Sequence, residues 1–152
     1  MNILNDYMDK DLIFLGLKIN EQKNLLEYMA KELNRSGSVN EKFIEKVIER
    51  EQEFPTGLQL EDIGVAIPHS DIDYVYMPAV AMAVLKDTVN FCSMENSDKT
   101  VPVSIVFMLA VSDGNKQLEL LQEIMRIIQS KTAIKNIIKA STKEEVLKAI
   151  NY

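Results

Sequence analysis

Apolar residues recur at two different spacings along this chain, and the spacing predicts which segments are helices and which are strands. Between residues 20 and 36 they fall on one face of a helix, at Leu25, Leu26, Met29 and Leu33. Asn20 can cap this helix at its start. Gly37 stands where a helix C-terminus favours a residue that tolerates positive φ. We therefore expect a first helix between Asn20 and Gly37.

A second amphipathic helix is predicted to follow directly, with an apolar stripe made by Phe43, Ile44, Val47 and Ile48. Ser38, with Glu41 three residues later, has the spacing of a capping box, so we expect the helix to begin at Ser38. Pro55 disfavours helical geometry at the residue before it. We therefore expect the helix to end just after Arg50-Glu51.

The remaining apolar segments predict strands and then more helices. Apolar runs typical of buried strands occupy residues 11–17, 64–67, 79–85 and 101–111. A long helix, capped by Ser112 or Asp113, is expected to carry its apolar residues at Leu118, Leu121, Ile124, Met125 and Ile128. Shorter helices are expected at 132–139 and from Thr142, which has Glu145 at capping-box spacing.

The alternation of strands and helices indicates the fold class. Strands that look buried on both faces, interleaved with amphipathic helices, are typical of a sheet covered by helices on its two sides. No repeat, low-complexity tract or linker interrupts the chain. We expect residues 1–152 to form a single three-layer α/β domain with a mixed, largely parallel sheet.

Composition excludes several classes of function. A net charge of −6 and a pI near 4.9 argue against binding to nucleic acid. No apolar run approaches the roughly 20 residues of a membrane helix, and the N-terminus does not resemble a signal peptide, so we expect a cytoplasmic protein without membrane insertion. One histidine and one cysteine, far apart, give no zinc-binding spacing. We expect Cys92 to be a partly buried small apolar residue.

The candidate chemistry centres on His69, the only histidine of the chain. Pro68 donates no hydrogen bond, so a strand is expected to end there and leave His69 at its C-terminal edge, where the sites of α/β sheets gather. An imidazole held in this way can attack phosphorus and form a phosphoramidate that transfers its phosphoryl group onward. A structural or surface role for a single histidine beside a proline is the alternative.

Residues before His69 can supply donors to a phosphoryl group, which needs positioned hydrogen bonds more than covalent help. Arg50 carries a planar donor fork. Thr56 offers a hydroxyl, and the Thr56-Gly57 turn offers backbone N–H groups that are open because glycine has no side chain. We expect these residues to surround the imidazole.

These motifs resemble a known family. The stretch from Arg50 to Leu58, with Val65 to His69, resembles the active-site signature of the fructose/mannitol-type enzyme IIA domains of the bacterial phosphoenolpyruvate-dependent sugar phosphotransferase system. The segments Glu53-Phe-Pro-Thr-Gly57 and Gln117-Leu-Glu-Leu-Leu121 are most similar to the galactitol-specific branch.

The resemblance implies a five-stranded mixed sheet, a phosphocarrier function and no cofactor or metal. It implies that His69 accepts phosphate from the phosphocarrier protein HPr and passes it to a cysteine of an enzyme IIB, which serves a membrane enzyme IIC. It places Arg50 near the phosphate and Thr56-Gly57 in a turn against the site. Mannitol and fructose relatives carry a second histidine where this chain has Gln117, which we expect to be a helper, since an amide donates a hydrogen bond but carries no charge.

Several alternatives stay open at this point. Nitrogen-type enzyme IIA proteins share the histidine motif and regulate other proteins through their phosphorylation state, and a histidine-dependent hydrolase is a third possibility that lacks a second catalytic group. Glu51 falls near the middle of the apolar stripe of its helix, so a buried carboxylate in need of a partner is expected there. It either supports a site residue or is a charge that faces inward at the helix end. Asp71 and Asp73 orient His69, form an acidic rim for a basic partner, or are solvated loop charges.

Overall fold

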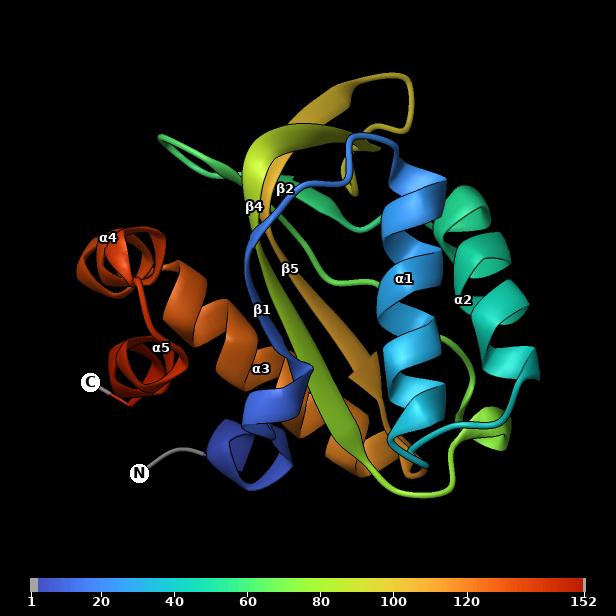
Figure 1. Cartoon of the computed structure of the whole chain (residues 1–152). Helices are drawn as coiled ribbons and strands as arrows, with labels where there is room; N and C mark the ends of the chain where they lie inside the picture. The colour runs from blue at the N-terminus through green and yellow to red at the C-terminus, as the bar shows by residue number, and fades with distance from the viewer. Residues whose placement is uncertain (1–2, 152) are drawn as a thin grey trace.

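A central sheet with helices on both faces makes up the computed structural model, which describes residues 3–151 (Figure 1). Within these residues the sheet has the strand order β1-β4-β5-β3-β2. The strands are β1 (Ile13–Leu17), β2 (Gly57–Gln59), β3 (Gly64–Ala66), β4 (Ala79–Cys92) and β5 (Thr100–Ala110). The α-helices are α1 (Gln22–Arg35), α2 (Lys42–Glu53), α3 (Gly114–Ile128), α4 (Lys131–Lys139) and α5 (Lys143–Ile150). Short 3-10 helices are η1 (Ile3–Tyr7), η2 (Lys10–Leu12) and η3 (Ile72–Tyr74).

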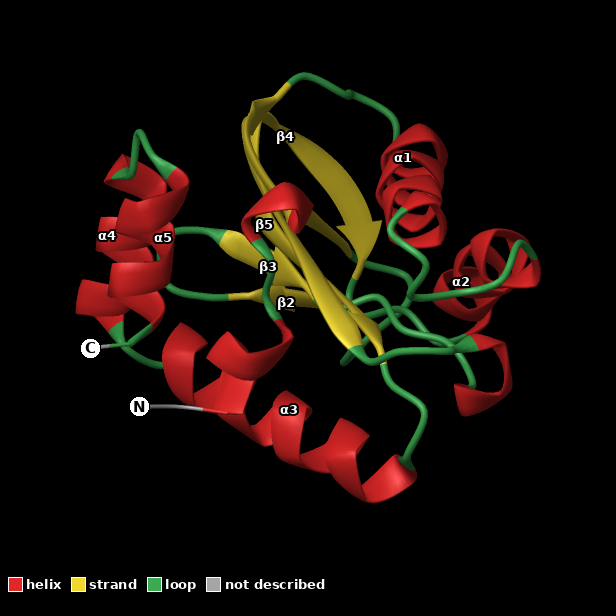
Figure 2. Cartoon of the chain, turned by 60° about the horizontal axis from the view of Figure 1, so that its bottom comes forward, coloured by secondary structure: helices red, strands yellow, loops and turns green. Residues whose placement is uncertain are grey.

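The predicted three-layer arrangement is confirmed. Helices α1 and α2 cover one face of the sheet, and α3, α4 and α5 cover the other (Figures 1 and 2). Successive residues of β4 point to opposite faces. Val80, Met82 and Val84 pack in the α3–α5 layer, while Ala81 and Ala83 pack in the α1–α2 layer. The central strands are therefore buried on both sides, as their apolar sequence indicated.

The sheet is mixed, as expected, but its parallel and antiparallel pairings are equal in number. Pairs β1–β4 and β3–β5 are parallel, whereas β2–β3 and β4–β5 are antiparallel. Residues 93–99 connect β4 to β5 and are too few for the crossover that a parallel pair needs, so these two long strands form a hairpin. The parallel pairing of β3 with β5 brings the end of β3 beside the end of β5.

Helix α2 begins later than its sequence pattern suggested. The prediction of a capping box at Ser38 was wrong, because the Ser38 carbonyl accepts hydrogen bonds from the N–H groups of Tyr76 and Met77. Val39 forms a bridge with Val75, which keeps this segment extended. The side chain of Asn40 instead accepts a hydrogen bond from the N–H of Phe43. A tertiary contact thus delays the helix to Lys42.

Other boundaries follow local signals with small shifts. Gly37 has φ of 87°, as expected after a helix, and Asp113 and Thr142 cap α3 and α5 with their side chains. Helix α1 begins at Gln22 without a side-chain cap, so Asn20 lies outside it. Helix α2 runs to Glu53. The first residues of the expected strand at 11–17 belong to η2.

Three sequence expectations about exposure and strands need correction. Cys92 ends β4 and is exposed, not partly buried, because β4 extends beyond residue 85 into a twisted hairpin at the rim of the sheet. Leu118 is 56% exposed and does not belong to the buried stripe of α3, which is made by Leu120, Ile124, Ile127 and Ile128. The motif segment at Gly57 is a strand, β2, not a turn. Within residues 3–151, no helix is both long enough and apolar enough to span a membrane.

Candidate functional site

His69 lies just beyond the end of β3, at the C-terminal edge of the sheet. The carbonyl of Pro68 accepts a hydrogen bond of 2.9 Å from the N–H of Leu109, and His69 itself forms a parallel bridge with Leu109 of β5. This pairing holds the backbone of His69 against the last residues of a buried central strand. The position is the strand edge that the sequence predicted, and its backbone is fixed by the sheet.

The imidazole of His69 has one nitrogen engaged by the backbone. Its Nδ1 lies 2.9 Å from the carbonyl oxygen of Ile67. Because a carbonyl only accepts hydrogen bonds, Nδ1 must carry the proton and donate it. In the neutral ring Nε2 then holds the lone pair. The geometry therefore leaves Nε2 as the ring nitrogen that is able to act as a nucleophile.

The surroundings of His69 favour this neutral form. Partial burial lowers the pKa of His69 below its ordinary value, and the positive charge of Arg50 lowers it further. The hydrogen bond to Ile67 and the negative charge of Asp71 act in the opposite direction. Because the net shift is downward, His69 is largely neutral at pH 7 and its Nε2 lone pair is free for attack without prior deprotonation.

Arg50 is held at the end of α2 by two neighbours. Its guanidinium carbon lies 4.6 Å from the centre of the Phe54 ring, and its Nη1 lies 3.5 Å from Oδ1 of Asp71. Both members of this ion pair are well exposed, so it contributes little to stability. The buried Nε of Arg50 has no hydrogen-bond partner among the described residues. The guanidinium of Arg50 therefore has a hydrogen-bond donor that no described residue satisfies, and its side chain lines an open pocket.

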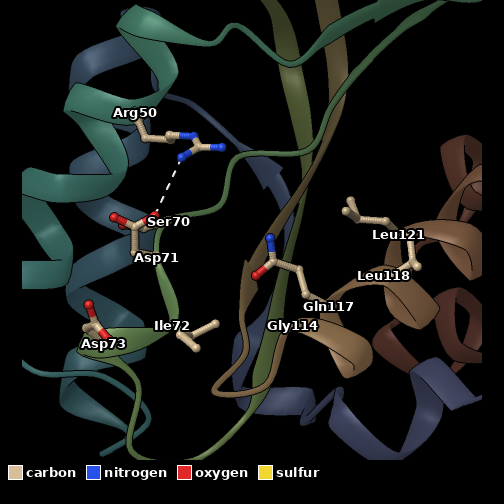
Figure 3. Close-up of a pocket in the computed structure, with 9 residues that line it drawn as sticks. All are labelled: Arg50, Ser70, Asp71, Ile72, Asp73, Gly114, Gln117, Leu118 and Leu121. Carbon is tan, nitrogen blue, oxygen red and sulfur yellow. Dashed lines mark ion pairs between the residues drawn. The ribbon is translucent and has the colours of Figure 1, made fainter.

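A shallow pocket opens at Ser70, the residue that follows His69 in the chain (Figure 3). It is lined by Arg50, Ser70, Asp71, Ile72, Asp73, Gly114, Gln117, Leu118 and Leu121. Arg50 from α2 and Gln117 from α3 extend into it from opposite sides. His69 is not among the lining residues, but it directly precedes Ser70, which is. The pocket brings together Arg50, Gln117 and the first turn of α3, whose N-terminal end favours negative charge.

The pocket also has an apolar rim that the sequence analysis did not identify. Ile72 and Leu118 line it and are 41% and 56% exposed. Phe54, which stacks against Arg50, is 53% exposed. A signal for Phe54 was present, because it follows Arg50 by four residues at the end of a helix. The exposure of Leu118 had no sequence signal, since its spacing fits an apolar stripe.

Thr56 and Gly57 have different roles from the ones that the sequence suggested. Both donors of Thr56 are already used: its N–H and its Oγ1–H each lie 2.7 Å from an oxygen of Glu51. Gly57 pairs with Ala66 inside the sheet, and a Cβ at Gly57 would come within 2.6 Å of the carbonyl oxygen of Cys92. The two donors of Thr56 are therefore not free to bind a phosphoryl group in this structure. Gly57 permits a close approach of two backbones, and Thr56 binds an internal carboxylate.

Glu51 is the buried carboxylate that the apolar stripe of α2 predicted. It is 4% exposed, and its partners are the two donors of Thr56. Burial raises the pKa of Glu51 to about 7, while the hydrogen bonds from Thr56 lower it. A buried carboxylate with such a pKa binds more protons in the folded state than in the unfolded chain near pH 6.

The raised pKa of Glu51 predicts that the free energies of unfolding of the natural protein and of Glu51→Gln differ by an amount that depends on pH. Because the folded pKa of Glu51 is raised, its stabilising contribution is fully present below the unfolded value of 4.5 and is lost as pH rises through about 7. We expect the unfolding free energy of the natural protein, relative to that of Glu51→Gln, to fall by about 2 kcal/mol between pH 5 and 7.5. Urea denaturation of both proteins at several pH values measures this difference. Parallel pH profiles would contradict it.

Metal binding has no support among residues 3–151, where no cluster of histidine, cysteine, aspartate and glutamate could hold an ion. The cationic and amide groups around the pocket suit an anion instead. The guanidinium of Arg50, the amide of Gln117 and the N-terminal end of α3 all favour a negatively charged group in this pocket.

Comparisons with known proteins identify the family of this chain. The family model described as "Phosphoenolpyruvate-dependent sugar phosphotransferase system, EIIA 2" matches residues 6–152. The chain is 27% identical over 152 residues to the "PTS system fructose-specific EIIABC component" of Bacillus subtilis, covering 97% of this chain but only 23% of that longer protein. It is 28% identical over 123 residues to the "PTS system galactitol-specific EIIA component" of Escherichia coli, covering 81% of each chain.

A solved structure shows the same fold. The "Nitrogen Regulatory Protein IIA-Ntr" of Neisseria meningitidis aligns with 98% of this chain and 99% of its own, with a TM-score of 0.83 and 24% sequence identity.

Proposed function

This chain belongs to the EIIA 2 family of the phosphoenolpyruvate-dependent sugar phosphotransferase system, and we propose that it carries phosphate from phospho-HPr to an enzyme IIB through His69. The observation that carries the proposal is the tethered imidazole: Nδ1 donates to the Ile67 carbonyl, which leaves the Nε2 lone pair for phosphorus. It lies near Arg50, whose charge acts on His69 and whose Nε has no hydrogen-bond partner within residues 3–151.

The proposed transfer uses both nitrogens of the ring. The Nε2 lone pair of His69 attacks the phosphorus of phospho-HPr, and the bond from that phosphorus to HPr breaks as the new N–P bond forms. The proton stays on Nδ1, where the Ile67 carbonyl stabilises the positive charge that develops on the ring. A cysteine thiolate of enzyme IIB then attacks the phosphorus, and the electrons of the N–P bond return to Nε2.

Arg50 is proposed to stabilise the phosphoryl oxygens during both transfers. Together with burial, its positive charge lowers the pKa of His69, and its Nε has no hydrogen-bond partner in the described part of the chain. Nη1 of Arg50 lies 3.5 Å from Asp71. Arg50 must give up this contact before all of its guanidinium nitrogens can donate to the phosphoryl group. Gln117 is proposed as a helper, because it faces the same pocket from α3 and offers a neutral donor.

The sugar-alcohol galactitol is the proposed specificity of the system. Gln117, in place of a second histidine, and 28% identity to a galactitol-specific EIIA component support it. The similar identity to a fructose-specific component leaves fructose as the competing sugar. A regulatory role, in which the phosphorylation state controls binding to another protein, is the second candidate. We also propose that the protein works in the cytoplasm, together with the phosphocarrier that supplies its phosphate.

Phosphate flow through a reconstituted system tests the proposal. The protein is incubated with phosphoenolpyruvate, enzyme I and HPr, and then with enzyme IIB proteins of the galactitol, fructose and mannitol systems. We expect one alkali-stable phosphate on the protein and fastest discharge to the galactitol-type enzyme IIB. If the protein takes up phosphate but transfers it to none of the three enzyme IIB proteins, the result would support the regulatory role. Absence of uptake from phospho-HPr would overturn the proposed function.

A further inference from the structure

Two neighbouring residues at the end of α2 send their side chains to different surroundings. Arg50 contacts Asp71 and lines the open pocket (Figure 3), while Glu51 is buried with 4% of its surface exposed. Successive helix residues are about 100° apart, so one turn of helix presents the guanidinium to the site and the carboxylate to the interior. Anything that fixes Glu51 therefore also fixes the backbone that carries Arg50.

Glu51 is fixed by Thr56 through both of its oxygens. The N–H of Thr56 donates to Oε2 and its hydroxyl donates to Oε1, each at 2.7 Å. Charge-assisted bonds of this length, made in pairs, define an orientation as well as a distance. Thr56 is itself 4% exposed. The two residues thus tie α2 to the segment that enters β2.

Thr56 also continues this connection to the histidine segment. Its Oγ1 accepts a hydrogen bond of 3.1 Å from the N–H of Ile67, a residue that is 1% exposed. The carbonyl of the same Ile67 accepts the Nδ1 proton of His69 at 2.9 Å. An unbroken run of hydrogen bonds therefore leads from the helix of Arg50 to the ring of His69.

We propose that Glu51 and Thr56 are positioning residues for phosphoryl transfer: their buried hydrogen bonds hold the Ile67 carbonyl, and with it the His69 ring, at a set place relative to Arg50. The Ile67 carbonyl decides which nitrogen of His69 is protonated and where the Nε2 lone pair points. Misplacement of reacting groups by about 1 Å can cost a hundred-fold in rate. A role in positioning, rather than in stability alone, therefore has a measurable signature.

The signature is the protonation pattern of His69. Since His69 is the only histidine, its two ring nitrogens give the only histidine signals in a ¹⁵N spectrum of the whole protein. With Nδ1–H donating to Ile67, the Nδ1 and Nε2 shifts are those of a single tautomer. Loss of the fixed carbonyl allows the second tautomer, and the two shifts then approach each other. This readout does not require phosphorylation.

The test compares Thr56→Val with Thr56→Ser and with a control. Valine has nearly the shape of threonine but lacks Oγ1, whereas serine keeps Oγ1 and loses only a methyl group. As a control, Ser38→Ala removes the hydroxyl of a residue that is also 4% exposed. That hydroxyl is hydrogen-bonded to Ser36 and is not part of the connection between Glu51 and His69.

We expect Thr56→Val to mix the His69 tautomers and to slow phosphate uptake from phospho-HPr by about ten- to a hundred-fold. Thr56→Ser should stay within about threefold of the natural protein, with one tautomer. Ser38→Ala should leave the tautomer unchanged.

The rate prediction rests on the proposed function, but the spectrum does not. If the natural protein takes up no phosphate, the proposed function fails while the tautomer comparison still decides whether Thr56 positions His69. A folded Thr56→Val protein with a single Nδ1–H tautomer and natural transfer rates would overturn the inference. Should Thr56→Val fail to fold, Glu51→Gln replaces it, because the amide offers one acceptor where Thr56 needs two. An unchanged His69 tautomer in Glu51→Gln would then count against the inference.

Discussion

Replacement of His69 by glutamine is expected to abolish phosphate uptake, by about a thousand-fold or more, because no other imidazole exists in the chain. Glutamine keeps a side-chain N–H that can donate to the Ile67 carbonyl, so the local hydrogen bond has a substitute. It has no nucleophilic nitrogen, because the amide lone pair is delocalised. The variant therefore separates the chemistry of His69 from its packing.

The measurement is mass spectrometry under alkaline conditions, which preserve phosphohistidine, after incubation with phosphoenolpyruvate, enzyme I and HPr. Circular dichroism and thermal unfolding confirm that His69→Gln is folded. His69→Ala serves as a second variant without the donor. A phosphate label that persists in both variants at the natural level would show that the phosphorylated residue lies elsewhere.

Replacement of Arg50 by lysine is expected to slow phosphoryl transfer by about ten- to a thousand-fold while the fold persists. Lysine keeps the positive charge but loses the planar fork, which can face a phosphoryl group with two donors at once. It also loses much of the stacking on Phe54 that holds the guanidinium 4.6 Å from the ring centre. The effect on stability is expected to be small, because the ion pair with Asp71 is exposed.

Single-turnover transfer from phospho-HPr measures this effect, and Gln117→Ala provides the matched comparison from the opposite side of the pocket (Figure 3). One neutral hydrogen bond contributes about 0.5–1.5 kcal/mol, so Gln117→Ala should lose about tenfold at most. If Arg50→Lys transfers phosphate at the rate of the natural protein, Arg50 has no role in transfer beyond its positive charge. A folded Gln117→Ala protein as inactive as His69→Gln would make the glutamine essential.

Local sequence signals determined the elements and the position of the central histidine. The apolar runs at 79–85 and 101–111 identified the two long strands because strands buried on both faces carry apolar side chains at nearly every position. Pro68 located the end of β3 because it cannot donate to a neighbouring strand. The apolar stripe of α2 also predicted that Glu51 is buried, since its position on that face follows from helical spacing alone.

Tertiary structure alone decided which partners these residues have. From the sequence, Thr56 and Gly57 were expected to offer donors in a turn. In the structure Thr56 donates to Glu51, and Gly57 pairs with Ala66 in the sheet. A local sequence pattern does not show which hydrogen-bond partners the rest of the fold supplies. The bridge between Val39 and Val75 delayed α2 in the same way. The Nδ1 proton of His69 is assigned by where the chain places the Ile67 carbonyl. Residue spacing fixes the face on which a side chain lies, whereas its protonation and its partners depend on contacts that only the folded chain creates.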